Sequence, residues 1–209
     1  MRNGEASEEA IKRLARLRDS TAEVTSFTEL LGIEGAAAAL YFGSFNTMLR
    51  ESWPFDFEKR NRRPPRDPVN ALLSLGYSMM SKELAGVCHT VGLDPFLGFF
   101  HQPRYGRPAL ALDLMEEFRP LIADSVAISL INRGEIRESD FIRSASGVFL
   151  NEQGRRAFWE HYFRRMDAEV SHPVFNYKMS YRRMLEVQAR QLWRFVRGEA
   201  EKYSAFTTR

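Results

Sequence analysis

The chain has 209 residues, which is the size of one domain and enough to bury a substantial apolar core. Hydrophobic residues make up 44% and charged residues 27%, as in ordinary soluble globular proteins. No uninterrupted apolar run approaches the ~20 residues that a membrane-spanning helix needs, so the composition excludes a helical membrane protein.

The formal net charge is only +3, but most of the 30 basic residues are arginine. The planar guanidinium suits bidentate contacts to phosphate, although GC-rich codon usage explains the same bias equally well. A single cysteine, Cys88, excludes an intramolecular disulfide and fits a reducing cytoplasm. The first ten residues are polar and acidic, unlike a signal peptide.

The N-terminal third predicts three helices. Ser7, followed by two acidic residues, is predicted to be the N-cap of the first helix. Apolar residues at helical spacing follow it. Ser26 and Glu29 match a capping box, which predicts a short helix ending near Gly32. A further helix is expected from Ile33 to about Arg50.

Residues 51–67 predict a loop, because Pro64 and Pro65 exclude a regular helix there. The loop carries a basic cluster, namely Lys59, Arg60, Arg62, Arg63 and Arg66. Asp67 and Pro68 then read as the N-cap and first residue of a helix that runs to about Val91.

The remaining pattern is also helical. A helix is expected from Pro108 or Ala109 through Glu116, with a kink at Pro120, continuing towards Ile131. Residues 148–150 are the only strand-like segment. Two further helices are expected over about 152–170 and 179–197, followed by a flexible polar tail at 199–209. The sequence therefore predicts an all-α fold, with residues 1–209 forming a single multi-helix domain.

The stretch from Gly98 to Pro120 holds the residues with chemical potential. His101 is followed by Arg104 and Arg107, and then by Asp113 and Glu116 within a leucine-rich helix. Carboxylates among apolar residues are costly to bury unless a cation compensates them. That cation is either a divalent metal, which accepts imidazole and carboxylate ligands, or a neighbouring arginine such as Arg119.

Five separated blocks, in order, resemble the CRISPR-associated integrase family, known as the Cas one endonucleases, which inserts new spacers into CRISPR arrays. They are L-L-G-I-E-G-A-A-A-A-L-Y-F from Leu30, D-P-V-N-A-L-L-S-L-G-Y from Asp67, G-L-D-P-F-L-G-F-F-H from Gly92, L-A-L-D-L-M-E-E-F-R-P from Leu110 and Y-R-x-M-L-E-x-Q-A-R-Q-L from Tyr181. The resemblance covers nearly the whole chain.

The resemblance implies a divalent-metal site of Mg²⁺ or Mn²⁺ held by Glu34, His101 and Glu116. Asp113 matches a further catalytic acid of the family. The implied reaction is a transesterification in which a DNA 3′-hydroxyl attacks a phosphodiester at the repeat boundary, and the same site with water would cut branched DNA. Taken alone, His101 reads as an ordinary core or loop histidine and Glu34 as a surface residue.

Six arginines are candidate phosphate contacts for double-stranded DNA, both spacer and CRISPR repeat: Arg60, Arg62, Arg63, Arg66, Arg104 and Arg107. The alternative for the loop cluster is a solvated charged loop. Asn70 and Tyr77 either orient a ligand or bond to the backbone, and the sequence leaves both possibilities open.

The resemblance also implies partners. Family members have a β-rich N-terminal domain that makes a homodimer, and they bind a small ferredoxin-like CRISPR adaptation protein. We find no β-rich block here, so we expect a C-terminal fragment or a naturally short or fused form. The second hypothesis is a non-catalytic helical DNA-binding or scaffold fragment that needs the missing domain for activity.

Overall fold

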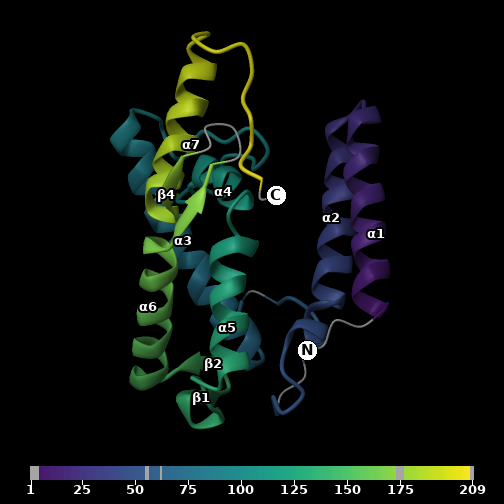
Figure 1. The fold of residues 1–209 in the computed structure, drawn as a ribbon, viewed down its shortest axis with the longest axis vertical. Helices are drawn as coiled ribbons and strands as arrows, with labels where there is room; N and C mark the ends of the chain where they lie inside the picture. Colours follow the sequence, from purple (N-terminus) through teal and green to yellow (C-terminus); the bar gives the residue numbers. More distant parts are fainter. Residues whose placement is uncertain (1–4, 55–56, 62, 173–176, 208–209) are drawn as a thin grey trace. The chain divides into compact units, whose positions relative to one another are not determined.

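A computed structural model describes residues 5–54, 57–61, 63–172 and 177–207 of the chain. The sequence predicts one domain, and the fold divides into two compact units. Unit 1 comprises Met1–Ala71 and Ile131–Asn151, and unit 2 comprises Leu72–Leu130 and Glu152–Arg209. Figure 1 shows the course of the elements in each unit.

Unit 1 begins with two helices that lie side by side, α1 (Glu5–Ser20) and α2 (Phe27–Gly43), joined through the short helix η1 (Thr21–Glu23) (Figure 1). The predicted cap at the start of α2 is confirmed, because Ser26 Oγ accepts a hydrogen bond from Glu29 N at 3.2 Å. The Glu29 carboxylate in turn accepts from Thr25 N at 3.0 Å. These contacts satisfy amides that have no partner inside the helix.

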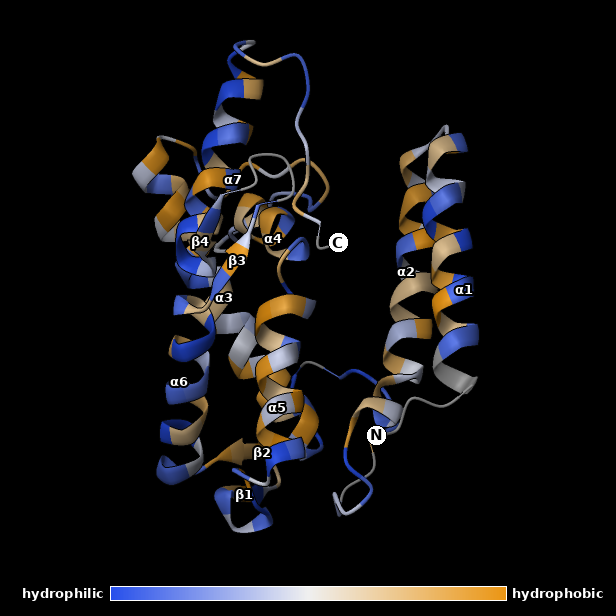
Figure 2. Ribbon diagram, in the orientation of Figure 1, coloured by the Kyte–Doolittle hydropathy of each residue, from blue (hydrophilic) through white to orange (hydrophobic). Residues whose placement is uncertain are grey.

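The predicted break at Gly32 is wrong, because α2 is continuous from Phe27 to Gly43. One glycine inside a helix costs only about 1 kcal/mol, and the surrounding leucine and alanine residues favour the helix. Figure 2 shows α2 as apolar along most of its length, whereas α6 is mostly hydrophilic. Ser44 ends α2, and a 3-10 turn, η2 (Phe45–Met48), follows.

The rest of unit 1 is a loop over residues 49–67, the first turn of α3 (Pro68–Val91), a 3-10 turn η4 (Glu138–Asp140) and a hairpin of β1 (Phe141–Ser144) with β2 (Gly147–Leu150). Val148 N donates to Pro65 O at 2.8 Å, so the loop is tied to the hairpin. Gly147 has φ +122, and a Cβ there would lie 2.7 Å from Pro65 O. Only glycine fits this junction without strain.

Unit 2 contains most of α3, then α4 (Ala109–Glu116), a π-helical turn η3 (Pro120–Asp124), and most of α5 (Ser125–Arg133). Asp67 caps α3 as predicted, since its carboxylate accepts from Asn70 N at 2.8 Å. Gly92, with φ +84, follows the end of the helix. The predicted kink at Pro120 is present as the π-turn, because proline lacks the amide that a regular α-helix requires.

The C-terminal part of unit 2 comprises α6 (Glu152–Asp167), a short hairpin of β3 (Glu169–Ser171) with β4 (Lys178–Ser180), and α7 (Tyr181–Val196). Its core is formed by fully buried side chains from several helices, including Leu72, Met80, Leu84, Phe118, Ile122, Phe158 and Tyr162. Gly76 lets α3 approach the π-turn, because a Cβ there would lie 2.9 Å from the Cβ of Ala123.

The mainly helical fold class is confirmed. The strand-like segment expected at 148–150 is present as β2, and the described residues contain three further short strands. The expected helix 152–170 ends at Asp167, where β3 soon begins. His89, expected as a partly buried helix residue, is exposed near the end of α3. In the described residues, no helix has the length and apolar character required to cross a membrane.

Candidate functional site

The loop between α3 and α4 presents His101, and its position depends on close packing against α4. Leu110 N donates to Pro95 O at 2.9 Å, which ties the first turn of α4 to the start of the loop. A Cβ on Gly98 would lie 2.6 Å from His101 O and 2.9 Å from the backbone carbon of Ala109. The missing side chain at Gly98 therefore allows the loop to fold back over the helix.

Asp113 holds this loop at four points. Its Oδ2 accepts hydrogen bonds from Phe99 N at 2.6 Å and Phe100 N at 3.0 Å. Its Oδ1 accepts from His101 N at 2.8 Å and lies 2.7 Å from His101 Nδ1. The His101 and Asp113 side chains are only 19% and 13% exposed, so these contacts are largely shielded from water.

Burial alone would raise the pKa of the Asp113 carboxyl. The hydrogen bonds from the His101 side chain and from the three consecutive backbone amides outweigh burial and hold this pKa below its ordinary value. Asp113 is therefore an ionised acceptor at neutral pH, and His101 Nδ1–H is its natural donor. In this tautomer His101 Nε2 carries a lone pair that can bind a ligand, and no described residue forms a hydrogen bond with it.

Glu116 forms a bidentate ion pair with Arg119, at 2.7 Å and 3.0 Å. The guanidinium is 16% exposed and lies 5.4 Å from the centre of the Tyr77 ring. Tyr77 OH donates to the buried Asp124 carboxylate at 2.7 Å. The hydrogen bond of Tyr77 to a side-chain carboxylate was not among its two expected roles. Arg119, the arginine expected as an alternative partner of Glu116, is the residue that pairs with it.

Glu117 was given no role by the sequence, yet it anchors the C-terminal tail. Its carboxylate accepts from Phe206 N at 2.7 Å, from Gln188 Nε2 at 2.9 Å and from Tyr203 OH. The Phe206 ring is buried and stacks on Phe118 at 5.3 Å. The expectation of a flexible tail is corrected for these residues, because two aromatic side chains and the Glu117 carboxylate, at the C-cap of α4, hold them.

The predicted metal ligands divide between the units. His101 and Glu116 belong to unit 2, and Glu34 lies on α2 in unit 1, where it is exposed. Within the described residues, no three His, Cys, Asp or Glu side chains gather closely enough to hold a metal ion. The donor types in unit 2 nevertheless fit a divalent ion, because a buried carboxylate orients the imidazole as in many metal-binding histidines.

The basic loop of unit 1 is built around Asn70, which is fully buried. Asn70 Oδ1 accepts from Asn61 N at 2.9 Å and from Arg60 Nη1 at 2.7 Å, and its Nδ2 donates to Lys59 O at 2.9 Å. Asn70 therefore bonds to the backbone, one of its two expected roles. Arg60 is held inside the loop, which favours a structural role for it.

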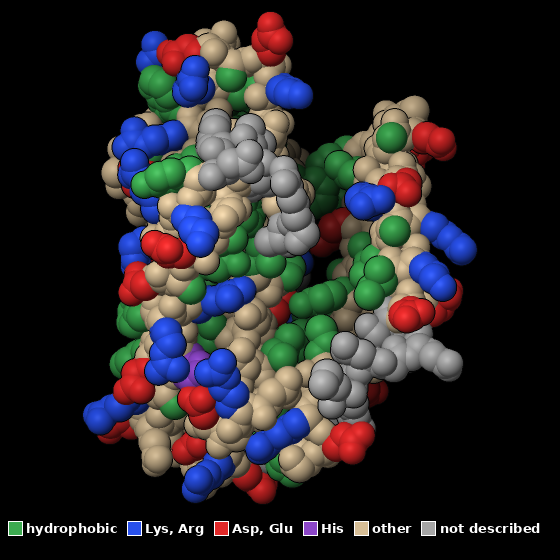
Figure 3. All heavy atoms as spheres, viewed as in Figure 1, with side chains coloured by type: hydrophobic (Ala, Val, Ile, Leu, Met, Phe, Trp, Pro, Cys, Tyr) green, Lys and Arg blue, Asp and Glu red, His purple; other side chains and the backbone are tan. Residues whose placement is uncertain are grey.

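The other candidate arginines differ in exposure. Arg63, Arg66 and Arg104 are exposed, Arg107 is partly buried, and Arg62 lies outside the described residues. On the face of unit 2 drawn in Figure 3, Lys and Arg side chains along α6 and α7 are interspersed with Asp and Glu. That mixed face does not form a basic track, so the arginines near His101 are better candidates for contact with phosphate.

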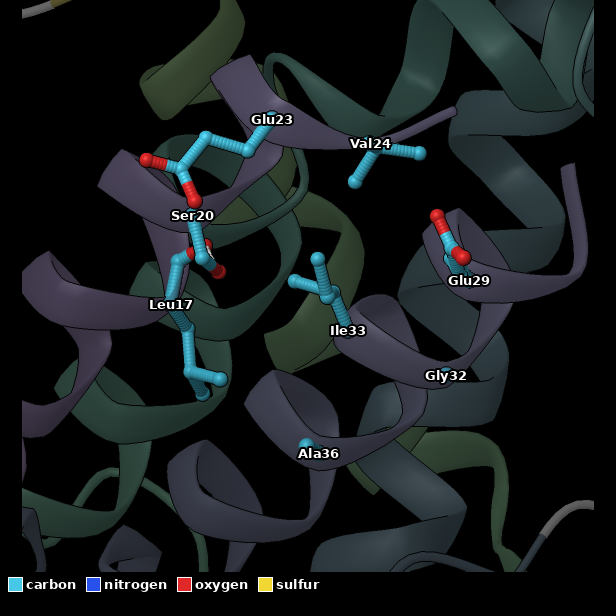
Figure 4. Close-up of a pocket in the computed structure, with 8 residues that line it drawn as sticks. All are labelled: Leu17, Ser20, Glu23, Val24, Glu29, Gly32, Ile33 and Ala36. Atoms are coloured by element: carbon cyan, nitrogen blue, oxygen red, sulfur yellow. Dashed lines mark hydrogen bonds between the residues drawn. The ribbon is translucent and has the colours of Figure 1, made fainter. Parts of the chain in front are cut away.

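An open surface pocket of about 360 Å³ is lined by residues of α1, of α2 and of the segment that joins them. Figure 4 shows Leu17, Val24 and Ile33 around it, and none of the predicted site residues is among its lining residues. Its lining is mostly apolar and offers no set of catalytic groups. The geometry in unit 2 is therefore the better candidate site.

Comparison with known proteins identifies the family. Residues 1–164 match the family model for CRISPR associated protein Cas1. The chain is 57% identical over 188 residues to a CRISPR-associated exonuclease Cas4/endonuclease Cas1 fusion of Geobacter sulfurreducens, covering 88% of this chain and 34% of the relative. It is 41% identical over 212 residues to a CRISPR-associated endonuclease Cas1 of Thermus thermophilus, covering 100% of this chain and 61% of the relative. It thus spans about one third and three fifths of these relatives.

Solved structures agree with the sequence match. A casposase bound to integration product aligns with a TM-score of 0.81 at 25% identity, covering 95% of this chain and 59% of the casposase chain. A Cas6-RT-Cas1–Cas2 complex aligns with a TM-score of 0.82 at 30% identity, covering 94% of this chain and 21% of the chain in the complex. The chain described here belongs to the CRISPR associated protein Cas1 family.

Proposed function

We propose that this chain carries the metal-dependent site of a DNA integrase and endonuclease that acts in CRISPR adaptation. The observation that carries the proposal is the contact between His101 Nδ1 and Asp113 Oδ1 at 2.7 Å, supported by three backbone amides on the same carboxylate. Such an arrangement fixes the imidazole orientation and leaves Nε2 for a ligand. The names of the relatives, endonuclease and casposase, favour phosphodiester chemistry.

In this proposal, His101 and Glu116 hold one Mg²⁺ or Mn²⁺ ion together with Glu34, as the family resemblance predicts. When bound, such an ion supplies a Lewis acid for the phosphodiester. Asp113 keeps the imidazole in the right tautomer and does not itself need to touch the ion. Arg119 pairs with the Glu116 carboxylate. On metal binding, this carboxylate would either bind Arg119 and the ion together or lose its pair with Arg119.

The proposed reaction exchanges one phosphodiester for another. A DNA 3′-hydroxyl attacks the phosphorus, a new P–O bond forms, and the bond to the departing 3′-oxygen breaks as that oxygen takes up a proton. With water as the nucleophile, the same site cuts the strand. Arg104 and Arg107, close to His101 in the chain, are placed by sequence to offset phosphate charge.

We propose spacer and repeat DNA as substrates and the small ferredoxin-like adaptation protein as a partner. The support is that a neighbouring structure contains Cas2 and another is bound to an integration product. The exposed Arg63 and Arg66 are proposed as secondary phosphate contacts, and Arg60 is less suited because it is already bonded to Asn70. The homodimer stays a prediction from the resemblance.

One experiment distinguishes a catalytic role of His101 from a purely structural one. Mn²⁺ binding is measured by calorimetry and DNA cutting by gel for the parent, His101→Ala and, as a control, the exposed His89→Ala. We expect His101→Ala to lose most of the Mn²⁺ binding and of the DNA cutting at a temperature at which the variant stays folded, and His89→Ala to match the parent. Unchanged binding and cutting in His101→Ala would contradict the proposal.

A second candidate function is a non-catalytic DNA-binding or scaffold domain. The observation that favours it is the ion pair of Glu116 with Arg119, which gives Glu116 a structural partner. This candidate predicts salt-dependent DNA binding that alanine at His101 and Glu116 leaves unchanged, together with no metal-dependent product.

A further inference from the structure

The turn between His101 and α4 presents an aromatic side chain at its tip. Arg107 N donates to Arg104 O at 3.0 Å, and the two residues form an isolated antiparallel bridge. Gly106, with φ +68, supplies the left-handed conformation that this tight turn requires. Tyr105 therefore lies at the tip of a short, hydrogen-bonded turn.

The Tyr105 side chain is wholly in water. Its exposed fraction is 109%, above that of every other exposed large hydrophobic residue in the described part of the chain. It has no hydrogen bond or ring contact with any described residue. The ring buries no apolar area when its own unit folds. Both faces of the ring are open to a planar ligand.

The two flanking arginines point to the charge of that ligand. Residues opposite one another in an antiparallel bridge have neighbouring side chains, so Arg104 and Arg107 bring like charges together. Neither side chain forms an ion pair with an acid among the described residues. Such an arrangement is unfavourable by itself, and an anion bound between the two guanidinium groups would relieve the repulsion.

An open aromatic face between two unpaired cations is the combination that single-stranded nucleic acid requires, because bases stack on the ring while phosphates bind the arginines. We propose that Tyr105 stacks on an unpaired nucleobase of DNA at the candidate site, with Arg104 and Arg107 on the phosphates beside it. The hydrogen-bonded turn holds the backbone of Tyr105, so less backbone entropy is lost on binding. The inference rests on the proposed function and adds a preference for DNA with an unpaired base next to the reacting phosphate.

The test uses the full chain, a branched DNA with 2-aminopurine at each unpaired position in turn, and a fully paired duplex of the same length. The variants are Tyr105→Ala, Tyr105→Phe and, as a control, Tyr177→Ala, which removes another tyrosine with a 67% exposed side chain. Fluorescence quenching reports stacking, and anisotropy reports affinity for each DNA.

We expect Tyr105→Ala to bind branched DNA about 5- to 100-fold more weakly, to lose quenching at one position, and to bind paired duplex as the parent does. Tyr105→Phe should restore both readouts, and Tyr177→Ala should match the parent. Equal quenching and affinity for parent and Tyr105→Ala would overturn the inference.

Failure of the inference is distinct from failure of the proposed function. If Tyr105→Ala behaves as the parent while His101→Ala still loses metal-dependent cutting, the catalytic proposal stands and the stacking proposal fails. If neither the parent nor any variant cuts DNA but Tyr105→Ala still loses quenching, the stacking proposal stands and the catalytic proposal fails. An equal loss of affinity for branched and paired DNA would mean that Tyr105 binds DNA without selecting unpaired bases, which also contradicts the proposal.

Discussion

The Asp113 carboxylate accepts hydrogen bonds from an imidazole and from three consecutive backbone amides, so it determines both the loop conformation and the orientation of His101. A neutral amide at the same position keeps the size of the side chain but removes the charge. It also offers only one acceptor oxygen to four donors. The geometry of the site at the residue scale therefore depends on this one negative charge.

Asp113→Asn is expected to lower stability by about 1–3 kcal/mol, because buried donors lose their acceptor. Mn²⁺ affinity should fall about 10- to 100-fold, since the second partner of a metal-binding histidine is lost. Chemical denaturation and calorimetry measure the two effects. The control is Asp167→Asn, at an exposed position. If Asp113→Asn bound Mn²⁺ as tightly as the parent, the Asp113 carboxylate would not orient the His101 imidazole for metal binding.

In the proposed metal site, Arg119 would compete with the ion for Glu116. Its guanidinium lies in a bidentate pair with the carboxylate and is largely buried against Tyr77. A positive charge in this position disfavours a second cation nearby. The ion pair thus stabilises the Glu116 carboxylate, and under the proposed function it would lower the affinity for a metal ion.

Arg119→Met is therefore expected to bind Mn²⁺ on the order of 3- to 10-fold more tightly while losing about 1–3 kcal/mol of stability. Arg190→Met, which breaks an exposed pair with Glu186 on α7, is the matched control and should change neither quantity appreciably. Weaker Mn²⁺ binding in Arg119→Met would mean that the arginine positions Glu116 for the ion instead of competing with it.

At the scale of elements, α4 carries contacts on several sides. Asp113 holds the His101 loop, Glu116 holds Arg119, and Glu117 holds the tail through Tyr203 and Phe206. A helix with only eight residues has little stability of its own, so these tertiary contacts and its buried leucines stabilise it. The π-turn that follows is packed against α3 at Gly76.

Gly76→Ala tests this packing, because its Cβ would lie 2.9 Å from Ala123 Cβ and 3.2 Å from the Phe158 ring. We expect a loss of about 1–3 kcal/mol from overpacking. Gly86→Ala on the same helix has nothing within 4 Å of the new Cβ and should be neutral or stabilising by up to about 1 kcal/mol. Equal stability of the two variants, measured by urea denaturation, would refute the close approach of α3 and the π-turn.

Capping residues, prolines and apolar periodicity predicted many of these elements. Contacts between residues far apart in the chain could not be predicted in this way. The caps at Ser26 and Asp67 and the kink at Pro120 depend on neighbouring residues, so the sequence alone was sufficient. The break at Gly32 was wrong because a single glycine is a weak signal. Strands β3 and β4, with three residues each, are too short to show an alternating pattern.

For the candidate site as well, the sequence identified several residues but not their contacts in the fold. The resemblance selected His101, Asp113 and Glu116, but periodicity did not distinguish a carboxylate that binds a loop from one that pairs with arginine. The role of Glu117 depends on contacts with residues 86 and 89 positions away, which no local pattern contains. Tyr105 was passed over because exposure is a property of the folded chain.

For the whole molecule, the proposed function gives this member of the Cas1 family a site for metal-dependent phosphodiester exchange. The chain spans about one third to three fifths of the relatives with which it was compared. Metal binding and strand transfer are therefore separate questions. A ligand set that binds Mn²⁺ can still need a partner chain to hold DNA in line for attack.

The most direct measurement is strand transfer and its reversal on a branched DNA substrate with Mn²⁺, comparing the parent with Glu116→Ala and with the exposed Glu160→Ala as control. We expect metal-dependent product from the parent and from Glu160→Ala. We expect none from Glu116→Ala at a temperature at which this variant stays folded, because the loss of its pair with Arg119 lowers stability as well. Equal product from the parent and from Glu116→Ala would contradict the proposed function.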